Sequence, residues 1–544
     1  MYFRNKLTLV IRCYYYILAY VDRRPSEIAY PTGLKIFLIV FALSLAVFCV
    51  ALDNTIIATA IPRITDEFHA LQNIGWYGSA YLLTTCAFQL FYGKLYSCFP
   101  IKMIFLMALS IFELGSVVCA TSPSSLALIT GRAIAGFGCA GVFTGGLIIV
   151  AHSAPVHKRP VYQGICGAIY GLASVVGPLI GGVFTDKLTW RWCFYINLPL
   201  GAVSALIVIF FLTLHSESPS NYKDLGFLDI IWRLDPIGTL LFVPSIICGL
   251  LALQWGGTSY AWDDGRIIGL FVLGALLLTA FVAVQLWLGE NATVPSRILF
   301  QRTIGFGSVF GFLLGGSFFL LLYFLPVWFQ AIKGVDALHS GIDSIPLVLS
   351  MSFGIMVSGG LVSKFGFYMP YVCASFVVTS IATGLLTTLT PSSSSAEWIG
   401  YQVLLGFGCG LAFQLPQIAA QAVLPLKDAA QGVSIIFFAQ TLGGALFVSI
   451  GNTVLDNKLV QYIRMIHMPT VDPSVIVKLG AIELRSYVPA QYVEQVVEAY
   501  NHALADTFRI SLILATLAAV GLAGMEWKSV HSHVEGEASD VSAT

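Results

Sequence analysis

Apolar runs long enough to cross a lipid bilayer recur along most of this chain. From Leu34 onward fourteen such runs follow one another, separated by short polar stretches. A helix of about 20 apolar residues spans the hydrocarbon core of a membrane, so each run predicts one transmembrane helix. The predicted spans are 36–61, 74–93, 102–121, 126–151, 162–185, 192–214, 236–255, 267–288, 304–328, 341–363, 368–390, 398–421, 432–455 and 507–527. The pattern therefore predicts an all-α integral membrane protein.

The placement of basic residues predicts which side of the membrane each loop occupies. If the N-terminus is cytosolic, seventeen lysines and arginines lie in the inner segments and only five lie in the short outer loops. Because basic residues favour the cytosolic side, both termini are predicted to be inside, as tails 1–33 and 528–544. The long segment 456–506 then faces outward, and its helical alternation over 491–508 predicts a helix lying on the outer surface.

Two short sequence matches predict an internal repeat. Segment 93–100 matches segment 359–366 at four of eight positions, 266 residues later. Segment 136–139 recurs unchanged as 406–409, 270 residues later. Both matches occupy the same place in their halves, after the second helix and within the fourth. The repeat predicts two six-helix bundles around a central site, a typical transporter architecture.

The predicted domains follow from this repeat. They are the N-terminal bundle 34–214, a linker with two extra helices at 215–303, and the C-terminal bundle 304–527.

Composition excludes several classes of protein. Hydrophobic residues make up 57% of the 544 residues, charged residues only 10%, and the formal net charge is zero; mean hydropathy is +0.84. A nucleic-acid partner would require a clustered basic surface. The eleven cysteines form no CxxC pair, so neither a metal site nor a disulfide framework is expected. A GxGxxG pattern at 136–141 lies inside a predicted span, which makes it an accidental match. The sequence indicates neither an enzyme nor a bound cofactor.

Three charged residues lie inside the apolar runs of the first half. They are Asp53, Glu113 and Arg132. Counting residues from the helix ends at about 1.5 Å each places all three roughly 9–14 Å below the outer surface, where they could meet. A carboxylate beside a guanidinium at this depth could take up and release a proton as its surroundings change. The alternative is a static ion pair between Asp53 and Arg132, and a purely structural role for Glu113.

The second half has amides and aromatic rings in place of deep charges. The repeat aligns Gln402 with Arg132. The residues expected to line a cavity for a bulky, mostly apolar ligand are Gln402, Phe413, Gln414, Gln417, Gln421 and Gln440. The alternative is that these amides form hydrogen bonds between helices.

Small residues recur at helical spacing in the uncharged run 162–185. Its core, Gly171-Leu-Ala-Ser-Val-Val-Gly177-Pro178-Leu-Ile-Gly181-Gly182, predicts a face on which another helix packs closely, with a weak point at Pro178. This wording resembles the fifth-helix antiporter motif of drug:proton exporters in the major facilitator superfamily. Small-residue packing without transport significance is the alternative.

Other segments extend this resemblance to nearly all of 34–527. They are 52–62 in helix one, 93–96 after helix two, 131–136 in helix four and 253–257 in the extra pair. The chain resembles the fourteen-helix drug:H+ antiporter branch, and within it fungal toxin and multidrug exporters. The resemblance implies proton-coupling roles for Asp53 and Arg132, and an exporter role for the motif at Gly177 and Pro178.

The inner loop after helix two departs from the family pattern. Gly93, Lys94 and Lys102 suit a gating loop, but Ser97 stands where the superfamily has an aspartate and Pro100 where it has a glycine. The usual charge relay of that gate is therefore in doubt.

The sequence and the resemblance together predict a proton-coupled antiporter that exports amphipathic or apolar small molecules by alternating access. Its energy source would be the proton gradient, with no cofactor, and its partners the substrate, protons and the lipid bilayer. It would act as a monomer in the plasma membrane, or in a vacuolar or vesicle membrane. The alternatives are a nutrient importer, which Glu217-Ser-Pro219 after helix six would suit, and a receptor or scaffold that transports nothing.

Overall fold

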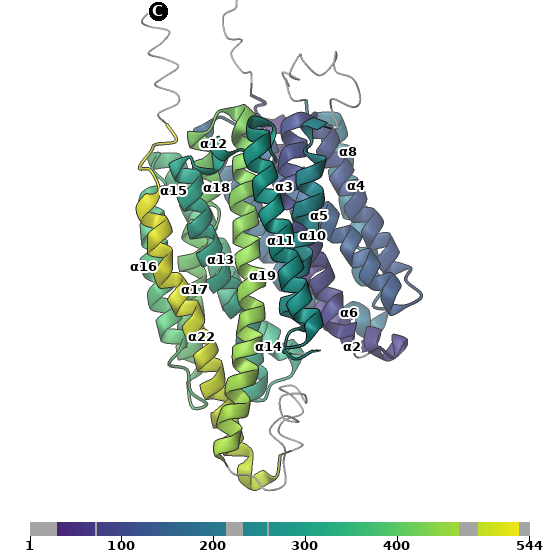
Figure 1. Ribbon diagram of the computed structural model, residues 1–544, viewed down its shortest axis with the longest axis vertical. Coiled ribbons are helices and arrows are strands. Elements are labelled where there is room, and N and C mark those ends of the chain that lie inside the picture. The colour runs from purple at the N-terminus through teal and green to yellow at the C-terminus, as the bar shows by residue number, and fades with distance from the viewer. Residues whose placement is uncertain (1–29, 71–72, 214–231, 258–259, 467–487, 532–544) are drawn as a thin grey trace, which may run out of the picture.

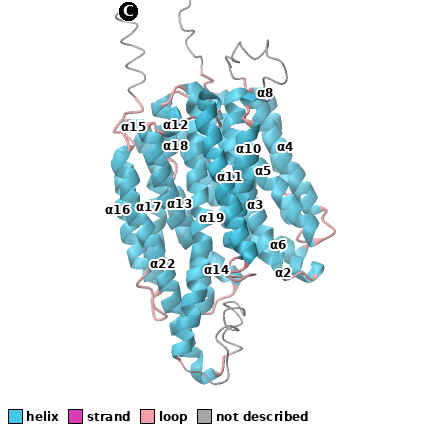
Figure 2. Ribbon diagram, in the orientation of Figure 1, coloured by secondary structure: helices cyan, strands magenta, loops and turns pink. Residues whose placement is uncertain are grey.

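The computed structural model consists of long, roughly parallel helices (Figure 1). It describes residues 30–70, 73–213, 232–257, 260–466 and 488–531. Most of the predicted N-terminal tail, residues 1–29, and most of the C-terminal tail, 532–544, lie outside the described residues. Within the described residues the only β pairing is two isolated bridges, and helices fill the view in Figure 2.

The described residues contain thirteen helices that are long and apolar enough to cross a membrane. Helix α3 (Ile74–Cys98) is not among them, because it carries more polar residues, such as Gln89 and Lys94. It is nevertheless 25 residues long and packs along α5 and α19. With α3 included, the helices correspond to the fourteen predicted spans.

The N-terminal helices pack mainly on one another. They are α2 (Leu34–Phe68), α3, α4 (Ile101–Ala120), α5 (Ser125–Ser153), α6 (Arg159–Lys187), α7 (Trp192–Tyr195) and α8 (Asn197–Phe211). The main contacts join α4 to α5, α2 to α6 and α3 to α5. The predicted sixth span begins as the short helix α7 and continues, after Ile196, as α8.

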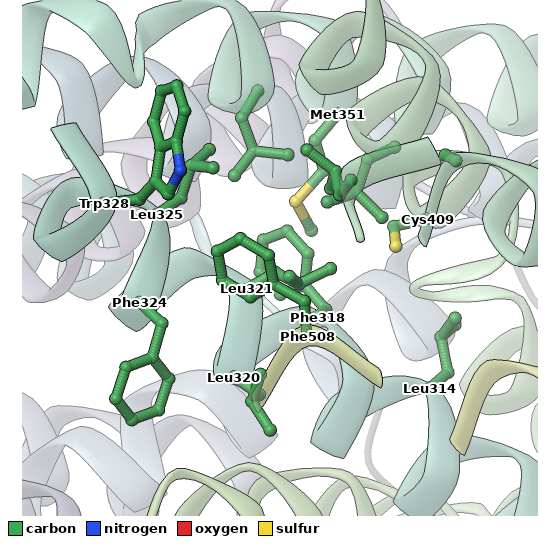
Figure 3. Close-up of a cluster of buried hydrophobic side chains, with 14 of the residues drawn as sticks. Leu314, Phe318, Leu320, Leu321, Phe324, Leu325, Trp328, Met351, Cys409 and Phe508 are labelled. Carbon is green, nitrogen blue, oxygen red and sulfur yellow. The ribbon is translucent and has the colours of Figure 1, made fainter. Parts of the chain in front are cut away.

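The C-terminal helices form the second bundle. They are α13 (Arg302–Trp328), α14 (Ala337–Asp343), α15 (Ile345–Phe365), α16 (Met369–Leu386), α17 (Ser395–Ala412), α18 (Leu415–Val423), α19 (Leu426–Met465) and α22 (Val493–Gly524). A π-helical turn, Phe329–Lys333, continues α13. The predicted twelfth span is broken between α17 and α18, and Pro416 is the second residue of α18. The core of this bundle is a cluster of large apolar side chains, many of them from α13 (Figure 3).

The outer segment differs from the prediction. Helix α19 has 40 residues and continues to Met465, and α22 begins at Val493, so the predicted loop 456–506 is helical at both ends. The stretch expected to lie flat on the surface is instead the first part of α22, which runs on unbroken into the last membrane span. Both helices project beyond the bundle at the bottom of Figure 1. Asp506 of α22 joins them by accepting a hydrogen bond from Tyr462 of α19, 2.9 Å long.

Glycines of the repeat occupy matching contacts in the two halves. A Cβ on Gly93 would collide with Ser434 of α19. A Cβ on Gly359 of α15 would collide with the backbone of Pro160, in the first turn of α6. Each glycine thus lets a helix of one half approach a helix of the other. The two seams between the halves are α3 against α19 and α6 against α15.

The linker pair lies over one of these seams. It consists of α10 (Pro236–Trp255) and α11 (Gly265–Leu288), followed by the short α12 (Ser296–Leu299). One buried apolar cluster combines side chains of α3, α10, α11 and α19. Within it the ring of Phe242 on α10 lies 5.2 Å from that of Phe438 on α19. The linker pair therefore contacts both halves.

Candidate functional site

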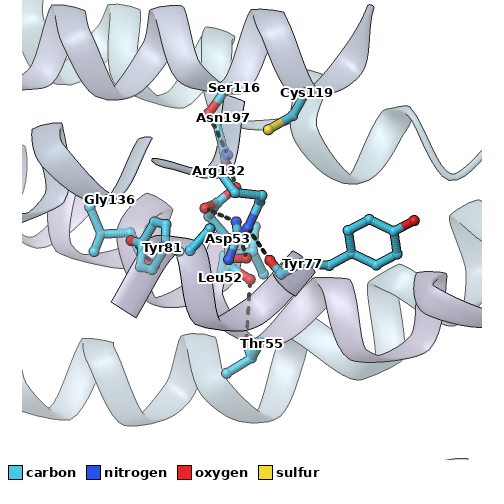
Figure 4. Close-up of polar contacts among 12 residues, drawn as sticks. Leu52, Asp53, Thr55, Tyr77, Tyr81, Ser116, Cys119, Arg132, Gly136 and Asn197 are labelled. Atoms are coloured by element: carbon cyan, nitrogen blue, oxygen red, sulfur yellow. Dashed lines mark hydrogen bonds and ion pairs between the residues drawn. The ribbon is translucent and has the colours of Figure 1, made fainter. Parts of the chain in front are cut away.

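A buried ion pair lies between α2 and α5 in the N-terminal half (Figure 4). Arg132 Nη1 lies 2.6 Å from Asp53 Oδ2, and both side chains have no solvent exposure. The Arg132 guanidinium also donates to two backbone carbonyls, those of Tyr77 at 2.8 Å and Asp53 at 3.2 Å. The structure thus joins two of the three charged residues that the sequence placed at one depth.

Helix α8 supplies a neutral partner to the same carboxylate. The Asn197 Nδ2 donates to Asp53 Oδ1 at 3.0 Å and to Ser116 Oγ on α4 at 3.1 Å. Both oxygens of Asp53 therefore accept hydrogen bonds, one from a charged donor and one from an amide. Sequence reasoning did not identify Asn197, because an uncharged amide beside a helix start gives no strong signal.

An aromatic ring covers the guanidinium. The Arg132 Cζ lies 4.4 Å from the ring centroid of Tyr81 on α3, which is a cation–π distance. The Arg132 Nη2 is buried and has no hydrogen-bond partner. The cluster consequently holds the charge of Arg132 firmly while leaving one donor group unused.

Glu113 stands apart from the pair. It lies on α4 about one turn from Ser116, and its carboxylate presses against Gly201 of α8, where a Cβ would collide with it. Neither carboxylate oxygen has a hydrogen-bond partner. The structure therefore places Glu113 near the cluster but does not join it to Arg132.

The glycines of α6 face two different helices. A Cβ on Gly177 would collide with Thr55 of α2, and one on Gly181 with Thr59 of α2. A Cβ on Gly171 would instead collide with Ser352 of α15, in the other half. A Cβ on Gly182 would meet no neighbouring atom within 4 Å. The prediction of one common face was wrong, because Gly171 in the N-terminal part of α6 faces α15, whereas Gly177 and Gly181 further along the helix face α2.

Amides form two hydrogen-bonded pairs, one turn apart along α18, in a row that begins on α6 and continues in the C-terminal half. The Gln163 Nε2 of α6 donates to Gln421 Oε1 of α18 at 3.2 Å. One turn further along α18, Gln417 Nε2 donates to Gln440 Oε1 of α19 at 2.8 Å. The Gln440 Nε2 donates to the carbonyl of Phe413 at 3.2 Å. Sequence reasoning missed Gln163, although it lies in the uncharged run 162–185.

Two further members of the expected cavity set lie differently. Gln414 contacts the N-terminal half, because a Cβ on Gly167 of α6 would collide with its amide. Gln402 donates to the carbonyl of Asp343 at 2.9 Å, within its own half, and is fully buried. The ring of Phe413 packs on that of Phe318, 5.4 Å away. The structure brings Phe413, Gln417 and Gln440 together and holds Gln402 in a separate contact.

The residues of the predicted gating loop make contacts with different parts of the protein. Lys94 is buried and donates to the carbonyls of Asn291 and Ala292 in the linker, both at 2.9 Å. Lys102 donates to the carbonyl of Ile209 at 2.6 Å, so its contact stays within the N-terminal half. Ser97 donates to the carbonyl of Lys94 at 2.8 Å. Of the two lysines expected to gate, Lys94 alone lies against another part of the molecule.

Comparison with known proteins gives consistent matches. The profile described as Major Facilitator Superfamily matches residues 43–448. The chain is 54% identical over 499 residues to the "MFS-type efflux pump MFS1" of Arthroderma benhamiae, covering 92% of both chains. It is 49% identical over 510 residues to "Efflux pump aflT" of Aspergillus parasiticus, covering 94% of this chain and 99% of that one. It is 48% identical over 517 residues to "MFS-type transporter phomT" of Diaporthe leptostromiformis, covering 92% and 87%.

A solved structure shares the fold at low sequence identity. The human organic anion transporter MFSD10 (TETRAN) superposes with a TM-score of 0.56 at 14% identity, covering 89% of this chain and all of that one. At this identity the likeness concerns the fold alone.

Proposed function

The chain belongs to the Major Facilitator Superfamily, and on that premise we propose that it is a proton-coupled antiporter that exports amphipathic or apolar small molecules. It is a multi-pass membrane transporter of small molecules, and its fungal relatives carry the names of efflux pumps. Export, proton coupling and the proton gradient as sole energy source are the steps that we add to this. No cofactor or enzymatic step enters the proposal.

The buried pair of Asp53 and Arg132 is the observation that carries proton coupling. An unpaired charge in the membrane interior is costly, so a buried carboxylate must either keep a cationic partner or bind a proton. Any movement that draws Arg132 away from Asp53 therefore favours proton uptake by Asp53, and the reverse movement favours release. Gly177 and Gly181 bring α6 against α2 at Thr55 and Thr59, a few residues after Asp53, so a movement of α6 would act on this carboxylate through α2.

Substrate selection is assigned to the chain of amides and aromatic rings in the second half. Gln417, Gln440 and Phe413 are joined by hydrogen bonds, and Gln414 reaches the other half at Gly167. The Oε1 atoms of Gln414 and Gln417 are buried without a partner, so each can accept a hydrogen bond from a substrate. Rings and neutral amides suit a mostly apolar molecule with a few polar groups.

The proposal also covers the membrane in which the protein acts and its oligomeric state. The excess of basic residues in the inner segments favours cytosolic termini and a plasma-membrane exporter, with an internal membrane as the other option. Each chain contains a complete pair of bundles, so we propose that it acts as a monomer.

The test is transport by Asp53→Asn in inside-out vesicles with an imposed pH gradient. A neutral amide cannot exchange a proton at this position, so uptake of an exported dye driven by the gradient should fall to background. Arg132→Lys should retain part of the transport, because it keeps a charge but loses the fork of donors. Uphill uptake at the wild-type rate by Asp53→Asn would remove the assignment.

Counterflow provides the control for this test. Exchange of labelled for unlabelled dye without a gradient requires binding and alternation but no net proton movement. Asp53→Asn should therefore keep counterflow while it loses gradient-driven uptake, which separates lost coupling from lost folding.

A further inference from the structure

We propose that the linker pair α10–α11 forms a latch on the inner face, in which the loop after α11 binds Lys94 of α3 and Asp235 positions the acceptors. This rests on the alternation between inner and outer openings in the proposed function, but not on proton coupling or on the substrate. The loop runs from Gly289 to Gln301, between α11 and α13. It joins the extra pair to the C-terminal half.

Lys94 is the group from the N-terminal half that the loop binds. Its side chain lies at the inner end of α3, and only 5% of the residue is exposed. Its ammonium donates to two successive backbone carbonyls, those of Asn291 and Ala292, both at 2.9 Å. A buried ammonium held by adjacent carbonyls requires a loop whose peptide planes are fixed.

Asp235 fixes those planes. It is buried at the start of α10, and its Oδ2 accepts from Thr293 N at 3.0 Å and from Thr293 Oγ1 at 2.9 Å. In a trans peptide the N–H of one residue and the C=O of the preceding residue point in opposite directions. Because Asp235 holds the Thr293 N–H, the carbonyl of Ala292 points away from Asp235, and it is this carbonyl that Lys94 binds. Asp235 therefore acts on the latch through the loop, as a positioning residue.

Two more contacts hold the loop in place. The Gln285 Nε2 on α11 donates to Asp235 Oδ2 at 2.6 Å, and its Oε1 accepts from Val294 N at 2.9 Å. The linker helices thus build the loop from both sides. They form a preassembled acceptor site for one ammonium group.

The loop is also attached to the C-terminal half. The Arg297 Nη2 lies 3.0 Å from Asp428 Oδ2 in the first turn of α19, and Arg297 Nε lies 3.2 Å from Glu290 Oε2. The loop contains the short helix α12 and continues directly into α13, which belongs to the C-terminal half. When the halves separate at the inner face, the loop will move with α19 and α13.

Lys94 lies beside the seam that must open. Its neighbour Gly93 packs against Ser434 of α19, so α3 and α19 touch at this point. Opening the inner face requires these helices to part, and the bonds from Lys94 to the loop must break in the same step. The latch thereby stabilises the form in which the inner face is closed.

The acceptors explain why such a latch can release in every cycle. A buried ion pair with a carboxylate is strongly destabilised when one partner leaves. Two peptide carbonyls are neutral, and water can replace them around Lys94 once the inner face opens. This contact stands beside the loop where Ser97 and Pro100 replace the residues of the usual charge relay. The hydrogen bonds from Lys94 to the linker loop would therefore hold the inner face closed in place of that charge relay.

The experiment measures closure of the seam directly. A cysteine replaces Ser434, which is buried under Gly93, and a membrane-impermeant maleimide is added to inside-out vesicles. Labelling is quantified on the peptide that carries position 434, so the native cysteines do not contribute. In this background Lys94→Met should label several-fold faster than the parent, because the inner face opens more often. Lys94→Arg should label at nearly the parent rate, since it keeps a cationic donor.

A lysine with a contact inside one half gives the matched control. Lys35 Nζ lies 2.5 Å from Thr213 Oγ1, and both residues belong to the N-terminal half at the inner face. Lys35→Met removes the same charge but should leave labelling at position 434 unchanged. Equal acceleration by Lys35→Met and Lys94→Met would overturn the latch, because it would show general loosening.

Asp235→Asn tests the positioning role and serves if Lys94→Met fails to insert. It retains the shape of the side chain but weakens its hold on Thr293, so labelling should rise to a value between the parent and Lys94→Met. Parent-rate labelling in both Asp235→Asn and Lys94→Met would disprove the proposal. If Lys94→Met does not insert, parent-rate labelling in Asp235→Asn alone would disprove it. The assay contains no substrate and no pH gradient, so its result is independent of proton coupling.

Discussion

The two halves make the same hydrogen bond at equivalent positions, but with different side chains. In the N-terminal half Arg132 Nε donates to the carbonyl of Tyr77 at 2.8 Å, and in the C-terminal half Gln402 Nε2 donates to the carbonyl of Asp343 at 2.9 Å. Asp343 follows Tyr77 by 266 residues and Gln402 follows Arg132 by 270, which are the offsets of the sequence repeat. A neutral amide therefore suffices for this helix contact.

The difference between Arg132 and Gln402 distinguishes the role of the hydrogen bond in helix packing from the role of the charge. If the contact with the neighbouring helix needs only an amide, the charge of Arg132 serves something else. The remaining contacts of its guanidinium supply that role, because they bind Asp53. The C-terminal half keeps the hydrogen bond to the backbone carbonyl, through Gln402, but has no charged side chain in this position. Its amides Gln417 and Gln440 form a hydrogen bond with each other. The comparison supports our proposal that proton transfer belongs to the N-terminal half and recognition by neutral groups to the C-terminal half.

The largest expected effect comes from copying the charge into the second half. Gln402→Arg would bury a guanidinium at a position where the Gln402 side chain donates to a neutral backbone carbonyl, that of Asp343. An uncompensated buried charge costs about 3–5 kcal/mol, so most of the protein should fail to fold. The measurement is the yield of monodisperse protein in detergent. The reverse copy, Arg132→Gln, should be recovered in better yield, because Asp53 can bind a proton and so lose its unpaired charge, whereas an arginine stays charged. Arg132→Gln should nevertheless lose gradient-driven transport, and equal yields would break the comparison.

The glycine seam gives the next largest effect. Gly177→Val would force α6 away from α2 at Thr55, two residues after Asp53, and overpacking of this kind costs about 1–3 kcal/mol. The inserted protein should either stop exporting or leak protons without substrate, as measured by dye efflux and by the decay of a pH gradient in proteoliposomes.

Gly182→Val sharpens this test. Gly182 belongs to the same motif, but open space surrounds the position of its Cβ. Export and the pH gradient should therefore survive. Loss of both in Gly182→Val and in Gly177→Val alike would show that the motif acts through helix flexibility and not through its contact with α2.

Substitutions in the amide chain should have a smaller and different effect. Gln414→Ala removes an amide that lies against Gly167 of α6 without touching Asp53 or Arg132. The order in which a panel of drugs is resisted should change several-fold, while transport keeps its dependence on the pH gradient. Loss of the pH dependence with an unchanged drug order would contradict the division between halves.

Parts of the site were visible in the sequence because charges are rare in apolar spans. Residue counting placed Asp53 and Arg132 at one depth, and the repeat aligned Gln402 with Arg132. The partners Asn197 and Gln163 were missed, because neutral amides occur in many spans and their directions follow from helix rotation. The carbonyl of Tyr77 could not be predicted at all, since every residue has one.

The helix pattern was predicted well where hydrophobicity alone decides it. The N-terminal part of α22 was wrongly predicted to lie flat on the membrane surface, because its polar face resembles that of a surface helix. The structure covers part of that face with α19, and Asn501 accepts from Trp328 Nε1 at 2.8 Å. Asn501 and Asp506 on this stretch are satisfied by tertiary contacts, which a sequence pattern does not reveal.

The smallest expected effect concerns an exposed counterpart of the buried pair. Glu67, at the C-terminal end of α2, accepts hydrogen bonds from Arg191 at 2.9 Å and from Trp190 Nε1 at 2.7 Å. The side chains of Glu67 and Arg191 are 44% and 27% exposed, so solvent screens the pair and it should contribute at most about 1 kcal/mol. The hydrogen bond from Arg191 lowers the pKa of Glu67 from its ordinary value. The folded protein therefore favours the ionised carboxylate more than the unfolded chain does. This stabilisation is complete above the unfolded-state pKa and is lost as the pH falls through the lowered value.

Glu67→Gln should reduce the apparent melting temperature slightly at neutral pH, the difference should vanish in acid, and gradient-driven transport should be unchanged. A transport defect as large as that of Asp53→Asn would show that burial is not what distinguishes the two acid–arginine pairs.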